Sequence, residues 1–151
     1  MPIIRLETQI HAPVERCFDL ARDLDLHRET MSHTGEKAVG GITSGLIGPG
    51  QAVTWEATHF GVRQRLTSRI TDFDSPHRFV DEMTEGAFQS LHHLHEFEDT
   101  TSGTMMRDTM TYVSPLGPLG KIADALFLER YMRGLLTARN ALLKAHAERS
   151  G

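Results

Sequence analysis

The sequence predicts an α+β fold in which a curved antiparallel sheet of about seven strands wraps around one long C-terminal helix. Residues 51–115 read almost entirely as alternating strands joined by short turns, which is typical of an antiparallel meander. Residues 121–148 change to the helical period. One amphipathic helix cannot cover a flat sheet of this width, so the sheet must curve around it and leave a hollow. We expect a single domain over residues 1–151.

The N-terminal region is expected to hold one strand and two short helices. Every second residue from Ile4 to Ile10 is apolar or threonine, so these side chains share one face of a strand. Pro13 suits the first position of a helix, because its missing N–H needs no partner there. The spacing of the apolar residues then predicts a short helix over residues 13–21 and a second over about 23–31.

The middle of the chain is expected to supply the rest of the sheet. Residues 35–50 contain several glycines but no phosphate-loop motif, so we interpret them as strands and turns at a sheet edge. The predicted longer strands are 51–60, 62–73, 78–85, 88–97 and 104–113. In the second of these, Arg63, Arg65 and Arg69 alternate with smaller residues and are expected on the solvent face.

The C-terminal helix carries its apolar residues in one broad arc. The members of this arc are Ile122, Ala125, Leu126, Leu128, Met132, Leu135, Leu136, Leu142 and Leu143. The polar residues placed outside it or at its rim are Arg130, Arg133, Asn140, Lys144 and Glu148. Glu129 and Arg139 fall inside the arc, and two interpretations stay open for them. They form a rim pair that extends to water, or they face a polar cavity.

The composition argues against several classes of function. The formal net charge of −4 argues against nucleic-acid binding, which needs a basic surface. A single cysteine, Cys17, excludes an intrachain disulfide and zinc motifs built on paired cysteines. No apolar run approaches the roughly 18 residues of a membrane span. The N-terminus has no signal-peptide pattern. We therefore expect a cytoplasmic protein without a membrane span, and we expect no cofactor.

Four segments carry a resemblance to a known family. They are IHAPVE at residues 10–15, SPHRF at 75–79, GT at 103–104 and YVSPLG at 112–117. In these segments the chain resembles the polyketide cyclase/dehydrase and lipid-transport superfamily, also called START-like or SRPBCC. The resemblance implies the helix-grip fold over nearly the whole chain. It leaves function open, since the superfamily includes lipid carriers, hormone receptors, cyclases and dehydratases.

Three further segments are similar to a narrower group of bacterial proteins. They are WEATHFG at residues 55–61, LTSRI at 66–70 and RFVDEM at 78–83. The subgroup that they resemble is often labelled cell-division-related. This label implies no particular chemistry, so the function must be argued from the residues that face the hollow.

Strand alternation predicts a mostly apolar inner wall with an unusual polar set. The polar members are Trp55, His59, Asp81, His93, His95, Asp108 and Tyr112. Three methionines on the same faces or on the helix arc complete the candidate ligand-binding residues, namely Met83, Met110 and Met132. A bulge in strand 88–97 would exchange its two faces, because His92 and Leu94 take the opposite side.

The inner histidines are expected to pair with acids. Unpaired carboxylates in an apolar wall are costly, so we predict that at least one inner histidine contacts Asp81 or Asp108 and has a raised pKa. His93 and His95 stand two residues apart and could offer two metal ligands, with His59 or Asp81 as a third. The resemblance does not imply a metal, and our prediction is that none is bound.

Three interpretations of function remain open at this stage. The first is a binding module that holds a hydrophobic or amphiphilic small molecule in the hollow. The second is an enzyme of the cyclase or dehydratase type, in which His93 or His95 abstracts a proton and Asp81 orients the imidazole. The third is an interaction protein, such as a homodimer, in which the hollow is incidental.

Overall fold

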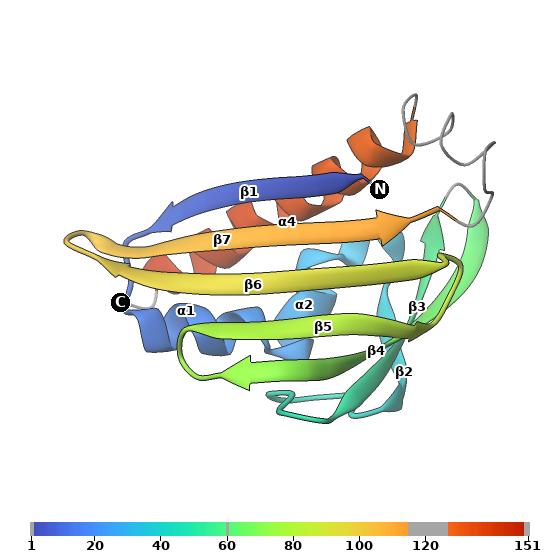
Figure 1. The fold of residues 1–151 in the computed structure, drawn as a ribbon, viewed down its shortest axis with the longest axis horizontal. Coiled ribbons are helices and arrows are strands. Elements are labelled where there is room, and N and C mark those ends of the chain that lie inside the picture. Colours follow the sequence, from blue (N-terminus) through green and yellow to red (C-terminus); the bar gives the residue numbers. More distant parts are fainter. Residues whose placement is uncertain (1, 60, 115–126, 150–151) are drawn as a thin grey trace.

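The computed structural model describes residues 2–59, 61–114 and 127–149, and it has the predicted α+β helix-grip architecture (Figure 1). The strands are β1 (Ile3–Ile10), β2 (Lys37–Gly41), β3 (Ala52–His59), β4 (Val62–Asp74), β5 (Arg78–Glu85), β6 (Ser90–Thr100) and β7 (Gly103–Val113). The helices are α1 (Val14–Ala21), α2 (Leu24–Thr30), the short 3-10 helix η1 (Ser32–Thr34) and α4 (Glu129–Arg149). The order of the strands and of the longer helices is the one that the sequence predicts.

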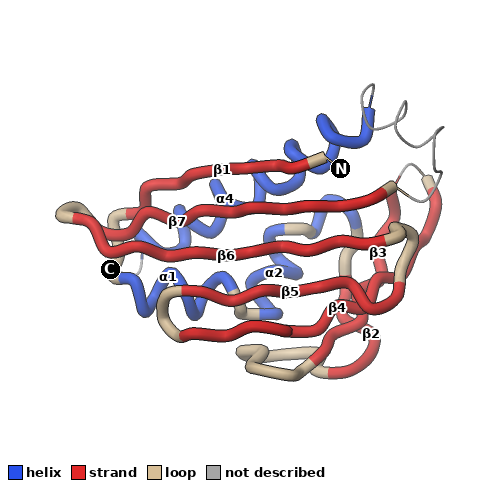
Figure 2. Tube along the Cα trace, in the orientation of Figure 1, coloured by secondary structure: helices blue, strands red, loops and turns tan. Residues whose placement is uncertain are grey.

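The strands form one antiparallel sheet in the order β1-β7-β6-β5-β4-β3-β2. The first strand of the chain therefore pairs with the last strand, in a register that joins Ile4 to Met110. Figure 2 shows α1, α2 and α4 together on one face of this sheet. The predicted arginines, Arg63, Arg65 and Arg69, are exposed on the other face. All side chains that could form a site between sheet and helices must therefore come from the covered face.

A tight junction connects β1 to α1. Pro13 is the N-cap of α1, so the helix begins one residue later than predicted. The Thr104 hydroxyl donates a 2.7 Å hydrogen bond to the Ala12 carbonyl oxygen. Gly103 has a φ of +140°, and a Cβ there would lie 2.1 Å from the Ile10 carbonyl oxygen. The start of β7 thus packs directly on the end of β1, and only glycine fits at this position.

The helix α4 packs one face against the sheet and the two short helices. Its buried residues are Leu136, Arg139, Asn140, Leu143 and Ala147, which recur at helical spacing. Two sequence assignments are corrected here, because Leu142 is 47% exposed and Asn140 is only 3% exposed. Leu142 lies about 100° around the helix from its buried neighbour and so turns to solvent. The predicted helical residues 121–126 lie outside the described residues.

The two charged residues inside the predicted arc of α4 have different surroundings. Glu129 is partly exposed and lies 3.6 Å from Arg133, one helical turn away. Arg139 is 4% exposed and faces the space between sheet and helix. The interpretation as a rim residue is therefore right for Glu129 and wrong for Arg139.

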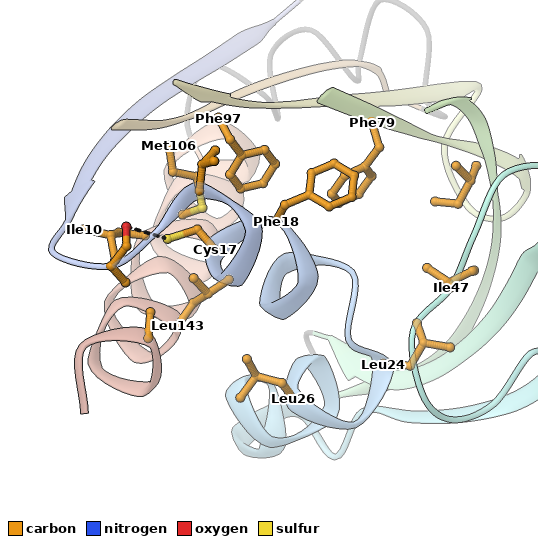
Figure 3. Packing of buried hydrophobic residues seen from close by; sticks show 14 of the residues in the cluster. Ile10, Cys17, Phe18, Leu24, Leu26, Ile47, Phe79, Phe97, Met106 and Leu143 are labelled. Atoms are coloured by element: carbon orange, nitrogen blue, oxygen red, sulfur yellow. Dashed lines mark hydrogen bonds between the residues drawn. The ribbon is translucent and has the colours of Figure 1, made fainter. Parts of the chain in front are cut away.

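A cluster of buried aromatic and aliphatic side chains packs beneath α1 (Figure 3). The ring of Phe18 meets the rings of Phe73, Phe79 and Phe97 edge-on, with centroid distances of 5.3, 5.4 and 5.4 Å. Such edge-to-face contacts stabilise a core beyond the area that they bury. Cys17 lies in the same cluster, and burial raises the pKa of its thiol, which keeps the sulfur in its unreactive form.

The register of β6 fixes which residues face the helices. β6 pairs with β7 without a shift from Ser90 to Thr100, so the bulge considered for this strand does not occur. The side chains of Leu91, His93, His95 and Phe97 are buried, as predicted from the alternation. The register shifts instead between β4 and β5, around Ile70. The histidines of β6 are therefore directed at the covered face.

Candidate ligand-binding cavity

A cavity of about 730 Å³ lies between the sheet and the described N-terminal part of α4. It is bounded by α2, by the covered faces of β3 to β7 and by residues 127–139. Its apolar lining includes Val53, Ala57, Leu66, Ile70, Leu91, Met110, Leu128, Met132, Leu135 and Leu136. This volume falls within the range of roughly 300–1,000 Å³ that is typical of small-molecule sites.

Two hydrogen-bonded histidine–aspartate pairs lie close together where β5, β6 and β7 form the wall of the cavity. We call the cavity-lining residues Asp81, His93, His95 and Arg139 the polar floor. His95 Nε2 and Asp81 Oδ2 share a hydrogen bond of 2.7 Å, and His93 Nε2 and Asp108 Oδ1 share one of 2.8 Å. The strand register places Asp81 opposite His93 and His95 opposite Asp108, so both bonds join diagonal neighbours of the sheet.

Asp108 lies beneath the polar floor and is almost fully enclosed. Besides His93, its carboxylate accepts a 2.7 Å hydrogen bond from Asn140 Nδ2, and Arg139 Nη1 lies 3.5 Å away. Two consecutive residues of α4 thus reach one acid of β7. A buried carboxylate needs both an opposite charge and hydrogen-bond donors, and Asp108 has both. The cluster therefore fixes α4 over the sheet at the edge of the cavity.

The environment of the floor keeps both acids ionised and His95 neutral at pH 7. Burial alone would raise the pKa of Asp81, but the hydrogen bond from His95, together with His93 and Arg139, lowers it to about 2. Burial lowers the pKa of His95 to about 4, with a further contribution from His93 and against the hydrogen bond to Asp81. In Asp108, the bond from His93 and the charge of Arg139 outweigh burial and lower the pKa.

The predicted pairing of an inner histidine with an acid therefore occurs, but at His95 the predicted rise in pKa does not. The pKa of His95 is lowered instead of raised, because loss of hydration outweighs one carboxylate. A neutral His95 donates from Nε2 to Asp81, which leaves the lone pair on Nδ1. That nitrogen is buried and lies 3.6 Å from Asp108 Oδ1.

A second polar group lines the cavity where β3 meets the start of α4. His59 Nδ1 and the Tyr131 hydroxyl share a hydrogen bond of 2.6 Å, and burial lowers the pKa of His59. Nearby on the lining, His27 Nε2 and Glu36 Oε1 lie 2.6 Å apart, and the His27 ring lies 4.6 Å from the ring of Trp55. The ligand space therefore has polar groups in two places.

The structure brings most of the predicted site residues to the cavity. Those that line it are Trp55, His59, Asp81, His93, His95, Met110 and Met132. Asp108, Met83 and Tyr112 are not among the described residues of the lining. Asp108 lies below His93, Tyr112 is fully buried with its ring 5.5 Å from Phe88, and Met83 is a partly buried member of the same core cluster. Strand alternation identified correctly which side chains lie on the inner face of the sheet. It could not show that α4 packs on part of this face and separates some of these side chains from the cavity.

Sequence reasoning missed several residues of the lining. His27, Glu36 and Tyr131 lie in three separate elements or loops, and no local pattern links them. For Asn140 a signal was present, because it lies four residues from Leu136 and three from Leu143 and so shares their helix face. A polar residue on such a face requires a buried partner, which is here Asp108.

One trio has the residue types of a metal site. One ring nitrogen each from His93 and His95 and one oxygen of Asp81 lie within 4.8 Å of one another. The two imidazole rings, however, are stacked, with their centroids 3.7 Å apart and an angle of 23° between their planes. An ion binds a ring nitrogen in the plane of that ring, so it cannot serve two stacked rings at the usual distance of about 2.1 Å. Absence of a bound metal remains our prediction.

Sequence comparison identifies the family. The family described as polyketide cyclase / dehydrase and lipid transport matches residues 1–148. The chain belongs to this family. A comparison with curated proteins finds no match.

Solved structures show the same fold as this family member. The protein TTHA0849 from Thermus thermophilus has 23% identity over 97% of this chain and 99% of its own, with a TM-score of 0.75. Major latex-like protein 151 from Panax ginseng has 16% identity over 97% of each chain, with a TM-score of 0.70. The di-domain ARO/CYC StfQ from the steffimycin biosynthetic pathway matches 98% of this chain with 51% of its own, at 15% identity and a TM-score of 0.76. At these identities the similarity establishes the fold alone.

Proposed function

We propose that this chain binds a hydrophobic or amphiphilic small molecule in the cavity between the sheet and α4. The observation that supports this most directly is the 730 Å³ space itself, which has a mainly apolar lining and a compact polar floor. Apolar walls supply affinity, and a few fixed polar groups orient the ligand. The membership of a family described by cyclases, dehydrases and lipid transport agrees with such a role.

The proposed contacts divide into two groups. Met110, Met132 and the ring of Trp55 provide deformable or flat apolar surface. Asp81, His93, His95 and His59 provide the polar contacts, and the hydrogen bonds described above fix their orientation. Fixed polar groups need little reordering when a ligand arrives, which favours binding.

Native mass spectrometry of the protein purified from cells tests this proposal directly. We expect a small molecule to accompany the chain and to be lost on unfolding. The variant Ala57→Phe, which adds a ring on the cavity wall, should release it. Thr58→Phe is the matched control, because the neighbouring side chain on β3 is exposed and points to the other face. Loss of the small molecule in both variants, or in neither, would contradict the proposed location.

An enzyme of the cyclase or dehydratase type is the second candidate, and the His95–Asp81 pair in the cavity wall favours it. A general base works best when its pKa lies near the working pH. The pKa of His95 is about 4 and that of Asp81 about 2, and Nδ1 of His95 points at Asp108. Both groups are thus weak bases at pH 7, so binding is the better supported function.

Proton abstraction has a simple test that does not require the natural substrate. A hydrophobic ketone such as acetophenone is incubated with the protein in deuterated water, and deuterium entry next to its carbonyl is followed by NMR. We expect no acceleration over buffer. Acceleration that is lost in Asp81→Asn and His95→Gln would support the enzyme instead.

The remaining expectations are independent of this proposal. Among the described residues, no helix has the length and hydropathy needed to cross a membrane. A cytoplasmic location, a homodimer and membership of the cell-division-related bacterial subgroup stay predictions from the sequence. Sedimentation analysis tests the homodimer, and a monomer at all concentrations would exclude it.

A further inference from the structure

Asp81 is the acid of the polar floor that meets the cavity. Its side chain is 24% exposed and belongs to the lining, whereas the side chain of Asp108 is 0% exposed. Within the described part of the chain, the hydrogen bond to Asp81 comes from His95 and engages Oδ2. Among the described residues, Oδ1 of this carboxylate accepts no hydrogen bond, so the cavity wall offers a second acceptor oxygen.

Among the residues that the structure describes, no lysine or arginine nitrogen lies within 4 Å of the Asp81 carboxylate. Arg139 is the cation of the floor, and its closest acid is Asp108, at 3.5 Å. Asp108 also accepts from Asn140 and His93. The donor to Asp81 is His95, which is neutral at pH 7 because burial lowers its pKa. Arg139 also helps to lower the pKa of Asp81, but it lies closest to Asp108, so a cation in the cavity would be the direct charged partner of Asp81.

The position of Asp81 is held rigidly by stacked rings. Phe79 stacks on His95 with a centroid distance of 4.1 Å and an angle of 14°, and His95 stacks on His93 at 3.7 Å. This column of rings prevents His95 from turning away, so the carboxylate that it holds has a fixed direction. On the β4 side Asp81 lies opposite Ile70, which is apolar and contributes no donor. On the β6 side it lies opposite His93, whose Nε2 bonds to Asp108 instead. A partly exposed carboxylate in such surroundings favours any ligand that brings a positive charge or a strong donor.

We propose that the cavity selects a hydrophobic amine, whose protonated nitrogen donates to the free oxygen of Asp81 while its apolar part fills the space beneath α4. This inference rests on the proposed function, since it names the class of ligand for the same cavity. An anionic ligand such as a fatty acid would bring a second negative charge to the part of the cavity that holds Asp81. Two negative charges close together repel each other strongly in a cavity that contains little water to screen them.

A matched series of ligands tests this selection. Decylamine, decanol and decanoate share one apolar chain and are cationic, neutral and anionic at pH 7. Their binding can be followed by the fluorescence of Trp55, which is the single tryptophan of the chain and lines the cavity. We expect decylamine to bind at least about tenfold more tightly than decanoate, with decanol between them, because a hydrogen bond to a charged group contributes more than a neutral one.

The variant Asp81→Asn keeps the shape and the acceptor for His95 but removes the charge. It should reduce the preference for decylamine over decanoate to about twofold or less. Glu85→Gln is the matched control, because Glu85 lies on the same strand and is exposed. It should leave the preference unchanged. The ranking of the three ligands by the unmodified protein needs no variant, so the proposal stays testable even if Asp81→Asn folds poorly.

The outcomes separate the two proposals. If the three compounds bind but decanoate binds as tightly as decylamine, the selection of amines is wrong and the binding function stands. If the preference survives in Asp81→Asn, the amine is recognised elsewhere and this assignment is wrong. If none of the three binds below its micelle-forming concentration and no small molecule accompanies the purified protein, the binding function itself fails.

Discussion

The space between sheet and helices is filled at one end and hollow at the other. Beneath α1, Phe18 packs edge-on against three phenylalanine rings, so side chains fill the space there. Beneath the start of α4, the same sheet bounds a cavity of about 730 Å³. Phe79 lies at the boundary, since its ring contacts Phe18 on one side and stacks on His95 on the other.

The difference between the two ends follows from which side chains meet across the gap. At the filled end, α1 brings an aromatic ring down between the strands. At the hollow end, the sheet presents small side chains at Ala57 and Ser68, and Leu135 and Leu136 of α4 line the same cavity. Stability should therefore reside mainly in the filled end and binding in the hollow end.

The largest effect is expected from Phe18→Ala. It removes a fully buried ring at the filled end and should lower the free energy of unfolding by about 3–5 kcal/mol. Urea denaturation measures this change. Phe88→Ala, which shortens a partly buried ring of the cavity lining, is the comparison and should cost less than half as much. Equal losses for the two variants would break the distinction between the ends.

The next effect concerns the acid below the polar floor. Asp108→Ala leaves Arg139 buried without its partner and Asn140 without its acceptor. It should lower the free energy of unfolding by about 3 kcal/mol. Asp81→Asn, in the cavity wall, should change it much less, because the amide oxygen still accepts from His95. Chemical denaturation of both variants would reveal whether the helix is anchored by Asp108 as described.

Much of the fold could be predicted because periodicity is a local property. Alternation correctly placed Leu91, His93, His95 and Phe97 on one face, and the helical period located α1 and α2 to within a residue or two. These patterns need no knowledge of which elements meet. The same argument gave seven strands and the C-terminal helix, and with them the expected hollow.

The details of the site could not be predicted because they depend on contacts between distant residues. From the sequence, Asn140 is placed outside the apolar arc of the helix or at its rim, yet Asn140 bonds to Asp108, 32 residues earlier. The direction of the pKa shift of His95 depends on how deeply α4 and Phe79 bury it, which no strand pattern reveals. Tyr131 reaches His59 from a helix 72 residues away, so this pair was missed as well.

Leu136→Ala sharpens the comparison, because this residue lies where the helix leaves the core and begins to cover the cavity. Leu136 is buried and also lines the cavity. Its truncation enlarges a space that already exists, so fewer packing contacts are lost than at the filled end. We expect a loss of about 2 kcal/mol, near the lower limit for a buried leucine. No loss in thermal or urea unfolding would mean that α4 is not packed on the sheet.

The smallest effect is expected from mild acid, and it distinguishes the two ends because the buried histidines of β6 lie on the hollow side of Phe79. His95 has a pKa of about 4 in the folded chain, against about 6.5 when unfolded, so the unfolded chain takes up the proton first as the pH falls. Its contribution to stability is complete above pH 6.5 and declines as the pH drops toward 4. Between pH 7 and 6 the loss in the free energy of unfolding should stay below about 1 kcal/mol.

The variant His95→Gln should show a weaker decline of this free energy over the same range, and NMR of the ring protons should show His95 uncharged at pH 6. A ring that is already protonated at pH 6 would mean that Asp81 and Asp108 outweigh burial, and that the hollow end gains stability in acid where we expect it to lose it.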